Sequence, residues 1–430
     1  MTKPRAKYYN TERRTGKWYV YMEFLKVDTL EHAREKLQTY GASYLLQTEY
    51  VPLQNALGRT LAEDIVAPSP IPSFRRATVD GYAVLAKDTA AAMEGIPTFL
   101  TQTGAVEMGV PASEAVKSGT CIQVPTGGMV PDGADAVVMV EYTEPFGTDG
   151  IAVYHSVAAG ENVVQIGEDI ECGETLLRRG RRLTPQDVGA LSAIGVTKVL
   201  VYTPPKVTIF STGDELVPPD TEPTIGQVRD INTYALTALA QTADFTVLRT
   251  EVLPDQEAVL EAKLRQAMTD SDIVFVSGGS SRGEKDKTHD VIQTVSSPGV
   301  FTHGLAIKPG KPTILGYDEP SKTLLAGLPG HPTAAVLVFE LLFGWLQRTL
   351  RETPGRPPIP GTLTCNVPGG GGRLVCHLCT ISWTGEGYEA EPIFSKSGRI
   401  TSLVEADGYF LLDRNCEGMT QGQTVLVYLF

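Results

Sequence analysis

The spacing of apolar positions changes several times along the chain, and these changes divide it into parts. Residues 28–46 carry apolar side chains every three or four positions behind a capping Asp28 or Thr29, which predicts a helix. From about 72 to 170 the apolar runs are short and alternate with Gly and Pro turns, as in a small β-rich domain. A helix start returns at Thr184, where proline follows the capping residue.

The middle of the chain alternates between predicted strands and helices. Residues 207–210 and 272–276 are short β-type runs typical of buried strands, and 232–243 and 255–268 have helical spacing. This rhythm over about 204–350 predicts a doubly wound α/β domain, which binds ligands at the carboxyl ends of its strands. A long apolar helix is predicted to end this domain, and the pattern after it is β-type again, which predicts a small C-terminal β-domain.

Composition narrows the functional classes. A length of 430 residues suggests roughly two to four domains. We see no apolar run of about 18 residues and no apolar core of a signal peptide, so we expect neither a membrane span nor secretion. The net charge of −13 makes nucleic acid a poor partner.

The cysteines and the N-terminal stretch add two expectations. Six cysteines in this length do not form a disulfide framework, and a reducing cytoplasm is the simplest setting. Cys376 and Cys379 form a lone C-x₂-C pair whose thiols would point to opposite faces of a strand, so a zinc site is not expected. Residues 1–21 are basic and lack a clear period, which predicts a flexible arm.

The candidate chemistry begins where the strand at 272–276 ends. The glycines of Ser277-Gly278-Gly279-Ser280-Ser281 allow a tight turn whose N–H groups can bind an anion, and its serine hydroxyls can add hydrogen bonds to phosphate. Asp286 then places a carboxylate where Mg²⁺ could be held beside a phosphate. By itself this run also fits an ordinary strand-to-helix turn.

Other polar segments lie at the ends of predicted strands or the starts of helices. Glu215 follows the strand at 207–210, and Asp230 opens a helix that it could simply cap. Lys308 and Lys311 supply positive charge on a segment stiffened by prolines. Together these groups indicate a phosphorylated ligand with a divalent metal, although all of them could be structural turns.

Two further groups complete the candidate set. The helix that begins at Pro332 offers an N-terminal anion site. In the β-rich domain, Asp80, Thr126 and Asp169 occupy polar turns, and each by itself fits an ordinary turn.

Taken together these motifs resemble the molybdopterin molybdenumtransferase family (MoeA type, and the C-terminal domain of gephyrin) over about residues 22–430. The motifs that carry the resemblance are Thr78-Val79-Asp80-Gly81-Tyr82-Ala83, Phe210-Ser211-Thr212-Gly213-Asp214-Glu215-Leu216, Ser277-Gly278-Gly279, Lys308-Pro309-Gly310-Lys311-Pro312 and Gly327-Leu328-Pro329-Gly330.

The resemblance implies a multidomain α/β plus β fold. After an arm at 1–21, its parts would be a split linking domain at 22–70 and 172–203, an inserted β-rich lid domain at 71–171, a doubly wound, molybdopterin-binding-like α/β domain at 204–352, and a C-terminal small β-barrel domain at 353–430.

The resemblance also implies an activity. A molybdopterin molybdotransferase inserts molybdate into adenylated molybdopterin, and Mg²⁺-dependent hydrolysis of the adenylate releases AMP and molybdenum cofactor. The implied protein is a cytoplasmic homodimer whose site is shared between protomers, and a separate molybdopterin adenylyltransferase would supply its substrate. Three alternatives stay open: a tungstate-inserting paralogue, a non-catalytic scaffold of the same fold, and a nucleotide-binding phosphohydrolase.

The implied site residues follow the matched motifs. Those implied as catalytic are Asp80, Glu215, Asp230 and Asp286, with Glu215 and Asp286 also as metal ligands. Those implied as cofactor-binding are Thr126, Asp169, Ser277, Gly278, Gly279, Ser280, Ser281, Lys308, Pro309, Lys311, Pro329, Gly330, His331 and Pro332.

Four positions depart from the family pattern. Many members have Ser at Ala77, Met at Val79, Val at Arg282 and Asn at His331. A neutral His331 could cap a helix, whereas a protonated His331 could bind an anion. These departures leave the choice between molybdate and tungstate open.

Overall fold

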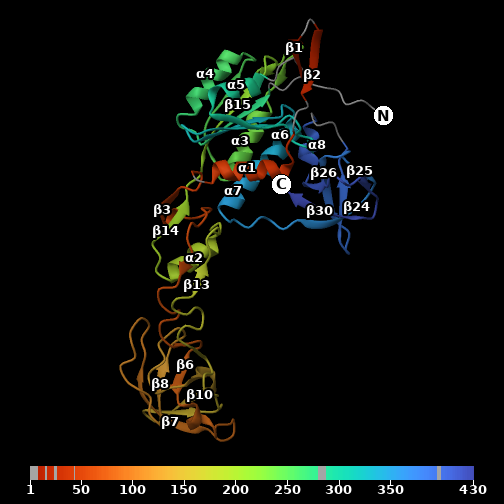
Figure 1. The fold of residues 1–430 in the computed structure, drawn as a ribbon. Helices are drawn as coiled ribbons and strands as arrows, with labels where there is room; N and C mark the ends of the chain where they lie inside the picture. The colour runs from red at the N-terminus through yellow and green to blue at the C-terminus, as the bar shows by residue number, and fades with distance from the viewer. Residues whose placement is uncertain (1–7, 15–16, 24–26, 43, 279–286, 395–398) are drawn as a thin grey trace. The chain divides into compact units, whose positions relative to one another are not determined.

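The computed structural model describes the chain except for residues 1–7, 15–16, 24–26, 43, 279–286 and 395–398. The described residues form two compact units (Figure 1). The first unit comprises 1–49, 180–182 and 200–430, and the second comprises 50–179 and 183–199.

A six-stranded sheet lies at the centre of the first unit. Its strand order is β18-β15-β19-β23-β22-β20, in which the first four strands are parallel and β22 runs antiparallel to both of its neighbours, β23 and β20. The bounds are β15 (Lys206–Thr212), β18 (Thr246–Leu253), β19 (Ile273–Gly278), β20 (Pro298–His303), β22 (Ile314–Asp318) and β23 (Thr323–Leu328). Strand β23 is buried at every position, as expected for a central strand covered on both faces.

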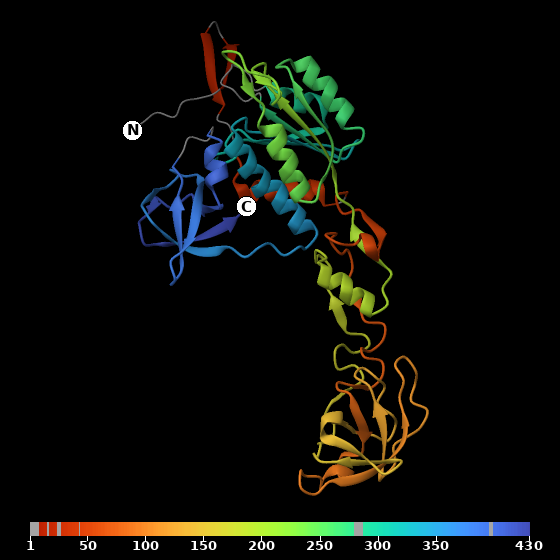
Figure 2. The ribbon, with the colours of Figure 1, turned by 180° about the vertical axis from the view of Figure 1, so that it is seen from behind.

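Helices cover both faces of this sheet (Figures 1 and 2). Ile273 and Phe275 of β19 join one apolar core with α1 (Leu30–Gly41), α3 (Asn232–Thr242) and α6 (Pro332–Phe339). Val274 and Val276 point the other way, into a second core with α4 (Glu257–Ala267) and α5 (Lys287–Val295). The predicted doubly wound α/β domain is therefore confirmed.

The long apolar helix was predicted from residue 333. It begins at Pro332 and runs through α6, a π-helical turn η4 (Glu340–Gly344) and α7 (Trp345–Leu350). Its length and composition would also suit a membrane span, but 78% of its apolar window is buried inside the protein. It is the central helix of the first core.

The C-terminal part closes into a small β-barrel. The order is β26-β27-β24-β30-β28, closed by pairing of β26 with β28. The bounds are β24 (Ile359–Leu363), β26 (Leu374–Trp383), β27 (Tyr388–Pro392), β28 (Gly408–Leu412) and β30 (Thr424–Leu429), with β25 (Val367–Pro368), β29 (Gly418–Met419) and α8 (Thr401–Glu405) beside them. Cys376 faces the first core and Cys379 the barrel core, so the two thiols do point to opposite faces, as predicted.

A β-rich domain forms most of the second unit. Its sheet has the order β10-β11-β7-β8-β6-β9. The bounds are β6 (Gly81–Val84), β7 (Thr98–Ala105), β8 (Thr120–Val124), β9 (Ala136–Met139), β10 (Thr143–Phe146) and β11 (Gly150–Val153). Helix α2 (Pro185–Ala193) begins as predicted, because Thr184 caps it and forms a capping box with Asp187.

The remaining strands are short. They are β4 (Ile65–Val66) paired with β13 (Thr175–Leu177), β5 (Arg76–Ala77) with β12 (Val163–Val164), β16 (Leu216–Val217) with β17 (Val228–Arg229), and in addition β3 (Thr48–Pro52), β14 (Lys198–Tyr202) and β21 (Ile307–Lys308).

Two local predictions need correction. Strands β1 (Tyr8–Arg14) and β2 (Lys17–Glu23) form an antiparallel hairpin in the stretch that was predicted as a flexible arm without a clear period. Consecutive aromatic residues such as Trp18 and Tyr19 hide the two-residue period there. Helix α1 starts after Thr29 as predicted, but it ends at Gly41 instead of 46, and it packs in the first core although it was assigned to the linking domain.

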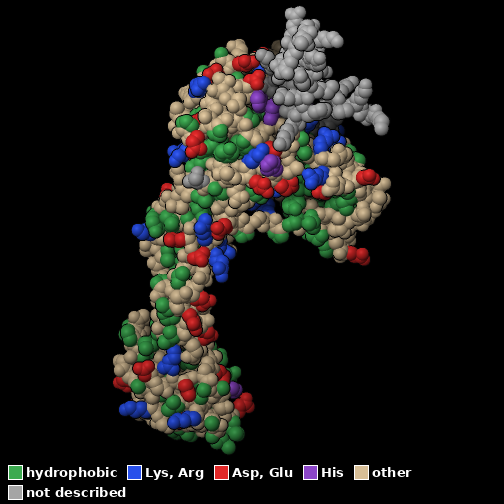
Figure 3. Space-filling view, viewed as in Figure 1, with side chains coloured by type: hydrophobic (Ala, Val, Ile, Leu, Met, Phe, Trp, Pro, Cys, Tyr) green, Lys and Arg blue, Asp and Glu red, His purple; other side chains and the backbone are tan. Residues whose placement is uncertain are grey.

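Charges are mixed on the surface. On the face seen in Figure 3, Lys and Arg side chains of the described residues are interspersed with Asp and Glu, and no broad basic area is visible there.

Asp28 ties the start of α1 to β20. Its buried carboxylate accepts hydrogen bonds from Lys36 Nζ and Thr302 Oγ1, both at 2.7 Å, and lies 3.0 Å from His32 Nδ1. Burial alone would raise the pKa of this carboxyl, but the hydrogen bonds from Lys36 and Thr302 outweigh it and hold the pKa below its usual value.

We expect Asp28→Asn to lower the free energy of unfolding of the first unit at pH 7 by about 3 kcal/mol, because Lys36 loses its buried partner. The depressed pKa means that this stabilisation is present above the unfolded pKa of 3.8 and is lost as the pH falls through the folded pKa. Denaturant unfolding at pH 7 and pH 3 should therefore show a gap that narrows in acid. The exposed Asp290→Asn should change stability by less than about 1 kcal/mol. Equal stability of Asp28→Asn and wild type at pH 7 would contradict this account.

Candidate functional site

The carboxyl ends of the parallel strands hold most of the predicted residues of the first unit. After β15 the chain continues through α3 to β18, which pairs with one edge of β15. Strand β19 comes later in the chain and pairs with the other edge of β15. The order of the strands therefore reverses between β15 and β19. In doubly wound sheets a crevice opens at this point and ligands bind there.

Gly278 ends β19 in a conformation that only glycine tolerates. Its φ is +118°, and an added Cβ would lie 2.2 Å from the carbonyl oxygen of Thr212 at the end of β15. At Gly278, where the predicted turn begins, the backbone of β19 is therefore in close contact with the backbone of β15 at Thr212. Gly279, Ser280, Ser281 and Asp286 lie outside the described residues.

Asn232 joins three segments at this edge. Its Nδ2 donates to Ser277 Oγ and to the carbonyl oxygen of Gly330, both at 2.8 Å. Ser277 Oγ in turn donates to the Pro329 carbonyl oxygen at 3.3 Å. The structure therefore brings together four predicted residues, Ser277, Gly278, Pro329 and Gly330, around a side chain that was not among the predicted site residues.

Several buried oxygens near these segments have no hydrogen-bond partner among the described residues. They are Asp230 Oδ2, Asn232 Oδ1 and Thr333 Oγ1. Asp230 Oδ1 accepts from the Thr233 N–H at 3.2 Å, so one oxygen of this carboxylate caps α3 and the other is unused. Because an unpaired buried polar atom costs about 1–3 kcal/mol, such oxygens are suited to pair with a bound ligand or water.

His331 precedes the helix that begins at Pro332. It is the N-cap residue of α6, but its side chain makes no capping hydrogen bond and is exposed. Of the two roles considered for His331, a side-chain cap is therefore wrong. Pro332 occupies the first helical position, as predicted.

Acidic side chains gather beside the end of β15. The Asp255 N–H donates to Asp214 Oδ1 at 3.1 Å. Burial first, and then the charges of Asp214 and Glu215, raise the pKa of the Asp255 carboxyl. Sequence reasoning missed Asp255, although its place at the start of the predicted helix at 255–268 was a usable signal. Within the described part of the chain, no three His, Cys, Asp or Glu residues are arranged to hold a metal.

The lysine segment lies on β21 and the loop after it. Lys308 and Lys311 are exposed, and neither forms an ion pair with a described residue. An added Cβ on Gly310 would lie 2.6 Å from Val338 of α6, so the loop packs closely on the helix that starts at Pro332. Both ammonium groups are available to an anion, but no hydrogen bond joins them to Asn232 or Ser277.

The second unit brings together two of its three predicted residues. Asp80 Oδ1 accepts hydrogen bonds from the Thr126 N–H at 2.7 Å and the Thr126 hydroxyl at 3.1 Å. Asp169 lies elsewhere and lines a hollow of about 260 Å³ with Glu174 and α2.

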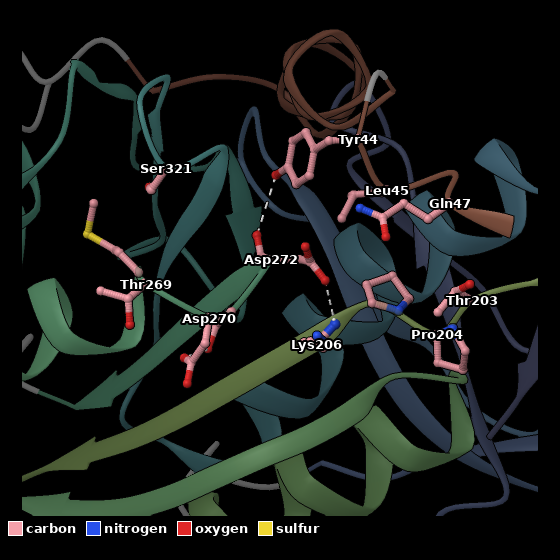
Figure 4. A pocket seen from close by; sticks show the side chains of 13 residues that line it. Tyr44, Leu45, Gln47, Thr203, Pro204, Lys206, Thr269, Asp270, Asp272 and Ser321 are labelled. Atoms are coloured by element: carbon pink, nitrogen blue, oxygen red, sulfur yellow. Dashed lines mark hydrogen bonds between the residues drawn. The ribbon is translucent and has the colours of Figure 1, made fainter. Parts of the chain in front are cut away.

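A hollow of about 200 Å³ lies at the opposite, amino ends of β15 and β19 (Figure 4). It is lined by Tyr44, Lys206 and Asp272 among others, and the Lys206 N–H donates to Asp272 Oδ2 at 2.7 Å. Burial raises the pKa of Asp272. None of the predicted site residues lines this hollow, so it is separate from the candidate site.

Gly278→Ala should destabilise the first unit by about 1–3 kcal/mol or more, because its Cβ would collide with backbone and strain φ. Gly330→Ala is the matched control, since its Cβ would lie no closer than 3.5 Å, to Gly278 Cα. Thermal unfolding of both variants measures the difference. Equal melting temperatures for the two would show that the close contact at Gly278 is not required.

Comparison with known proteins agrees with this arrangement. Three family models match: "MoeA N-terminal region (domain I and II)" over 28–195, "Probable molybdopterin binding domain" over 208–348, and "MoeA C-terminal region (domain IV)" over 360–430. The molybdopterin molybdenumtransferase of Haemophilus influenzae is 31% identical over 94% of this chain and 98% of its own, and that of Bacillus subtilis is 31% identical over 89% and 90%. Two crystal structures of the molybdopterin biosynthesis MoeA protein of Pyrococcus horikoshii resemble this structure over 94% of the chain. The first has a TM-score of 0.81 at 36% sequence identity and is covered over 99% of its length. The second has a TM-score of 0.79 at 33% sequence identity and is covered over 100% of its length. The chain therefore belongs to the MoeA family of molybdopterin molybdenumtransferases.

Proposed function

We propose that this protein inserts molybdate into adenylated molybdopterin, with hydrolysis of the adenylate and release of AMP and molybdenum cofactor. The observation that carries the proposal is the junction of Asn232, Ser277-Gly278 and Pro329-Gly330 at the switch point of the sheet. A phosphoanhydride substrate needs N–H donors and cations around its oxygens, and the start of this turn, the N-terminus of α6 and the lysine segment can supply them.

The roles of the residues follow from their chemistry. Lys308 and Lys311 bind oxyanions, either phosphate or molybdate. The unpartnered oxygens of Asp230 and Asn232 accept N–H groups of the substrate. In the second unit, Asp80 is held by Thr126 with one oxygen, and Asp169 adds a further carboxylate; we propose that all three residues take part in the reaction.

We further propose that Mg²⁺ assists the hydrolysis. Glu215 and Asp286 would hold it. Burial, and then the charges of Asp214 and Glu215, raise the pKa of Asp255, and this gathering of carboxylates favours a cation there. Mg²⁺ commonly keeps several waters and needs only one or two carboxylates beside a substrate phosphate. When bound, it would neutralise charge on the phosphoanhydride. We expect a cytoplasmic homodimer that receives its substrate from a separate molybdopterin adenylyltransferase.

The activity test uses purified protein with adenylated molybdopterin and Mg²⁺. We expect AMP release to require molybdate, and molybdenum cofactor to form in step with it. A faster reaction with tungstate would identify a tungstate-inserting enzyme, and absence of AMP release with either oxyanion would contradict the proposal.

Asp80→Asn should lower the rate of AMP release by about two orders of magnitude, because it removes the charge but keeps an oxygen for Thr126. Asp88→Asn is the control: this half-buried carboxylate of the same domain accepts from the Gly119 N–H at 2.8 Å and the Ser118 hydroxyl at 3.0 Å, and it is not a proposed site residue. We expect Asp88→Asn to keep full activity. Equal rates for the two variants would show that Asp80 serves only the turn.

Lys308→Met and Lys311→Met should each weaken binding of adenylated molybdopterin or molybdate by about one to two decades. A charge-assisted hydrogen bond contributes roughly 1.5–3 kcal/mol, and each 1.4 kcal/mol is about tenfold in affinity. Both side chains are exposed, so the melting temperature should hardly change. Isothermal titration with each ligand decides this; unchanged affinities in both variants would place the lysines outside the site.

A further inference from the structure

We infer that His377 of the β-barrel is a positioning residue for the Lys308 ammonium. The inference rests on the proposed function, because it assigns His377 to the anion-binding lysine segment. His377 belongs to the run Cys376-His377-Leu378-Cys379, whose two thiols are buried in separate cores. Among the described residues the histidine between them belongs to no group that could hold a metal, and its aromatic surroundings indicate a different role.

Strand pairing places Lys308 beside His377. Strand β21 adds to the barrel as a parallel neighbour of β26, with Ile307 opposite Leu374 and Lys308 opposite Val375. The Leu374 N–H donates to the Ala306 carbonyl oxygen at 2.9 Å and fixes this register. His377 follows Val375 by two residues, so it lies on the same face of the sheet as Lys308 and diagonally next to it.

Aromatic neighbours hold the imidazole in one orientation. The ring stacks on Phe410 at a centroid distance of 5.2 Å and 23°, and the edge of Phe394 approaches at 6.4 Å. His377 Nε2 lies 3.2 Å from the Pro368 carbonyl oxygen. A carbonyl can only accept, so Nε2 carries the proton and, in the neutral ring, Nδ1 is left as an acceptor.

The charge state of the ring suits this role. Burial lowers the pKa of His377, the hydrogen bond to Pro368 opposes this, and the nearby charge of Lys308 lowers the pKa further. The ring is therefore mainly neutral at pH 7. One N–H of the Lys308 ammonium can then be given to Nδ1, which leaves the other two donors for an oxyanion. Holding a flexible lysine before the ligand arrives reduces the entropy that binding must offset.

The first test does not depend on the proposed activity. NMR titration of the His377 ring should show a higher pKa in Lys308→Met than in wild type, because a nearby positive charge has been removed. Lys311→Met removes the same charge from the same loop and should leave the His377 pKa unchanged. A His377 pKa that does not respond to Lys308→Met would overturn the inference.

The second test is a double-mutant cycle on molybdate affinity. His377→Phe keeps the stacked ring but removes Nδ1, and we expect it to weaken molybdate binding by about three- to tenfold. In the Lys308→Met background the same change should have little effect, since the group that it positions is gone. Equal, additive losses in both backgrounds would mean that His377 acts on the fold alone.

The two tests separate this inference from the proposed function. If wild type binds no molybdate, the proposed function fails, and the NMR response to Lys308→Met alone decides whether His377 and Lys308 are paired. If His377→Phe does not fold, the titration of Lys308→Met and Lys311→Met still decides it, because His377 is intact in both.

Discussion

The structure of the candidate site depends on the close approach of backbones where β19 ends. Gly278 lies so near the Thr212 carbonyl that no side chain fits, and Gly330 lies against Gly278 from the other side. The Asn232 side-chain amide stabilises this close approach, because its Nδ2 donates hydrogen bonds to both Ser277 Oγ and the Gly330 carbonyl oxygen. The ends of β15 and β19, the start of α3 and the loop before α6 are therefore fixed by a few short contacts. Such a rigid edge can present N–H groups and buried oxygens to a ligand without reorganising.

The sheet explains why these contacts meet there. Buried runs on β19 and β23 make both strands central, and the helices on the two faces bury alternate side chains of β19. The strand order reverses between β15 and β19, and ligands of doubly wound sheets bind at such a point. The lysine segment is held differently. It lies on β21, which pairs with the barrel, and it packs through Gly310 on α6. The barrel therefore helps to place Lys308, and under the proposed function the C-terminal domain takes part in binding.

The sequence predicted the fold class well because periodicity reports burial. The run at 272–276, the cap at Thr184 and the proline at 332 each have a local physical cause, and all three were confirmed. The hairpin at 8–23 was not predicted, because adjacent aromatic residues mask the alternation of apolar and polar side chains that indicates a strand. For the site, glycines and prolines identified Gly278 and the loop before α6. Asn232 and Asp255 were missed as site residues because their roles depend on partners 45 or more positions away, or on charges from another loop, which local spacing cannot reveal. The roles of Asp286 and of Gly279 to Ser281 stay predictions.

The central claim is that substrate binds at the carboxyl ends of β15 and β19, in contact with the segments joined by Asn232. A crystal structure of the protein with AMP and molybdate tests this most directly. The account predicts phosphate oxygens within hydrogen-bond distance of the turn that begins at Gly278, and a ligand N–H paired with Asp230 Oδ2 or Asn232 Oδ1. A ligand bound instead in the hollow lined by Tyr44 and Asp272, at the opposite edge of the sheet, would contradict it.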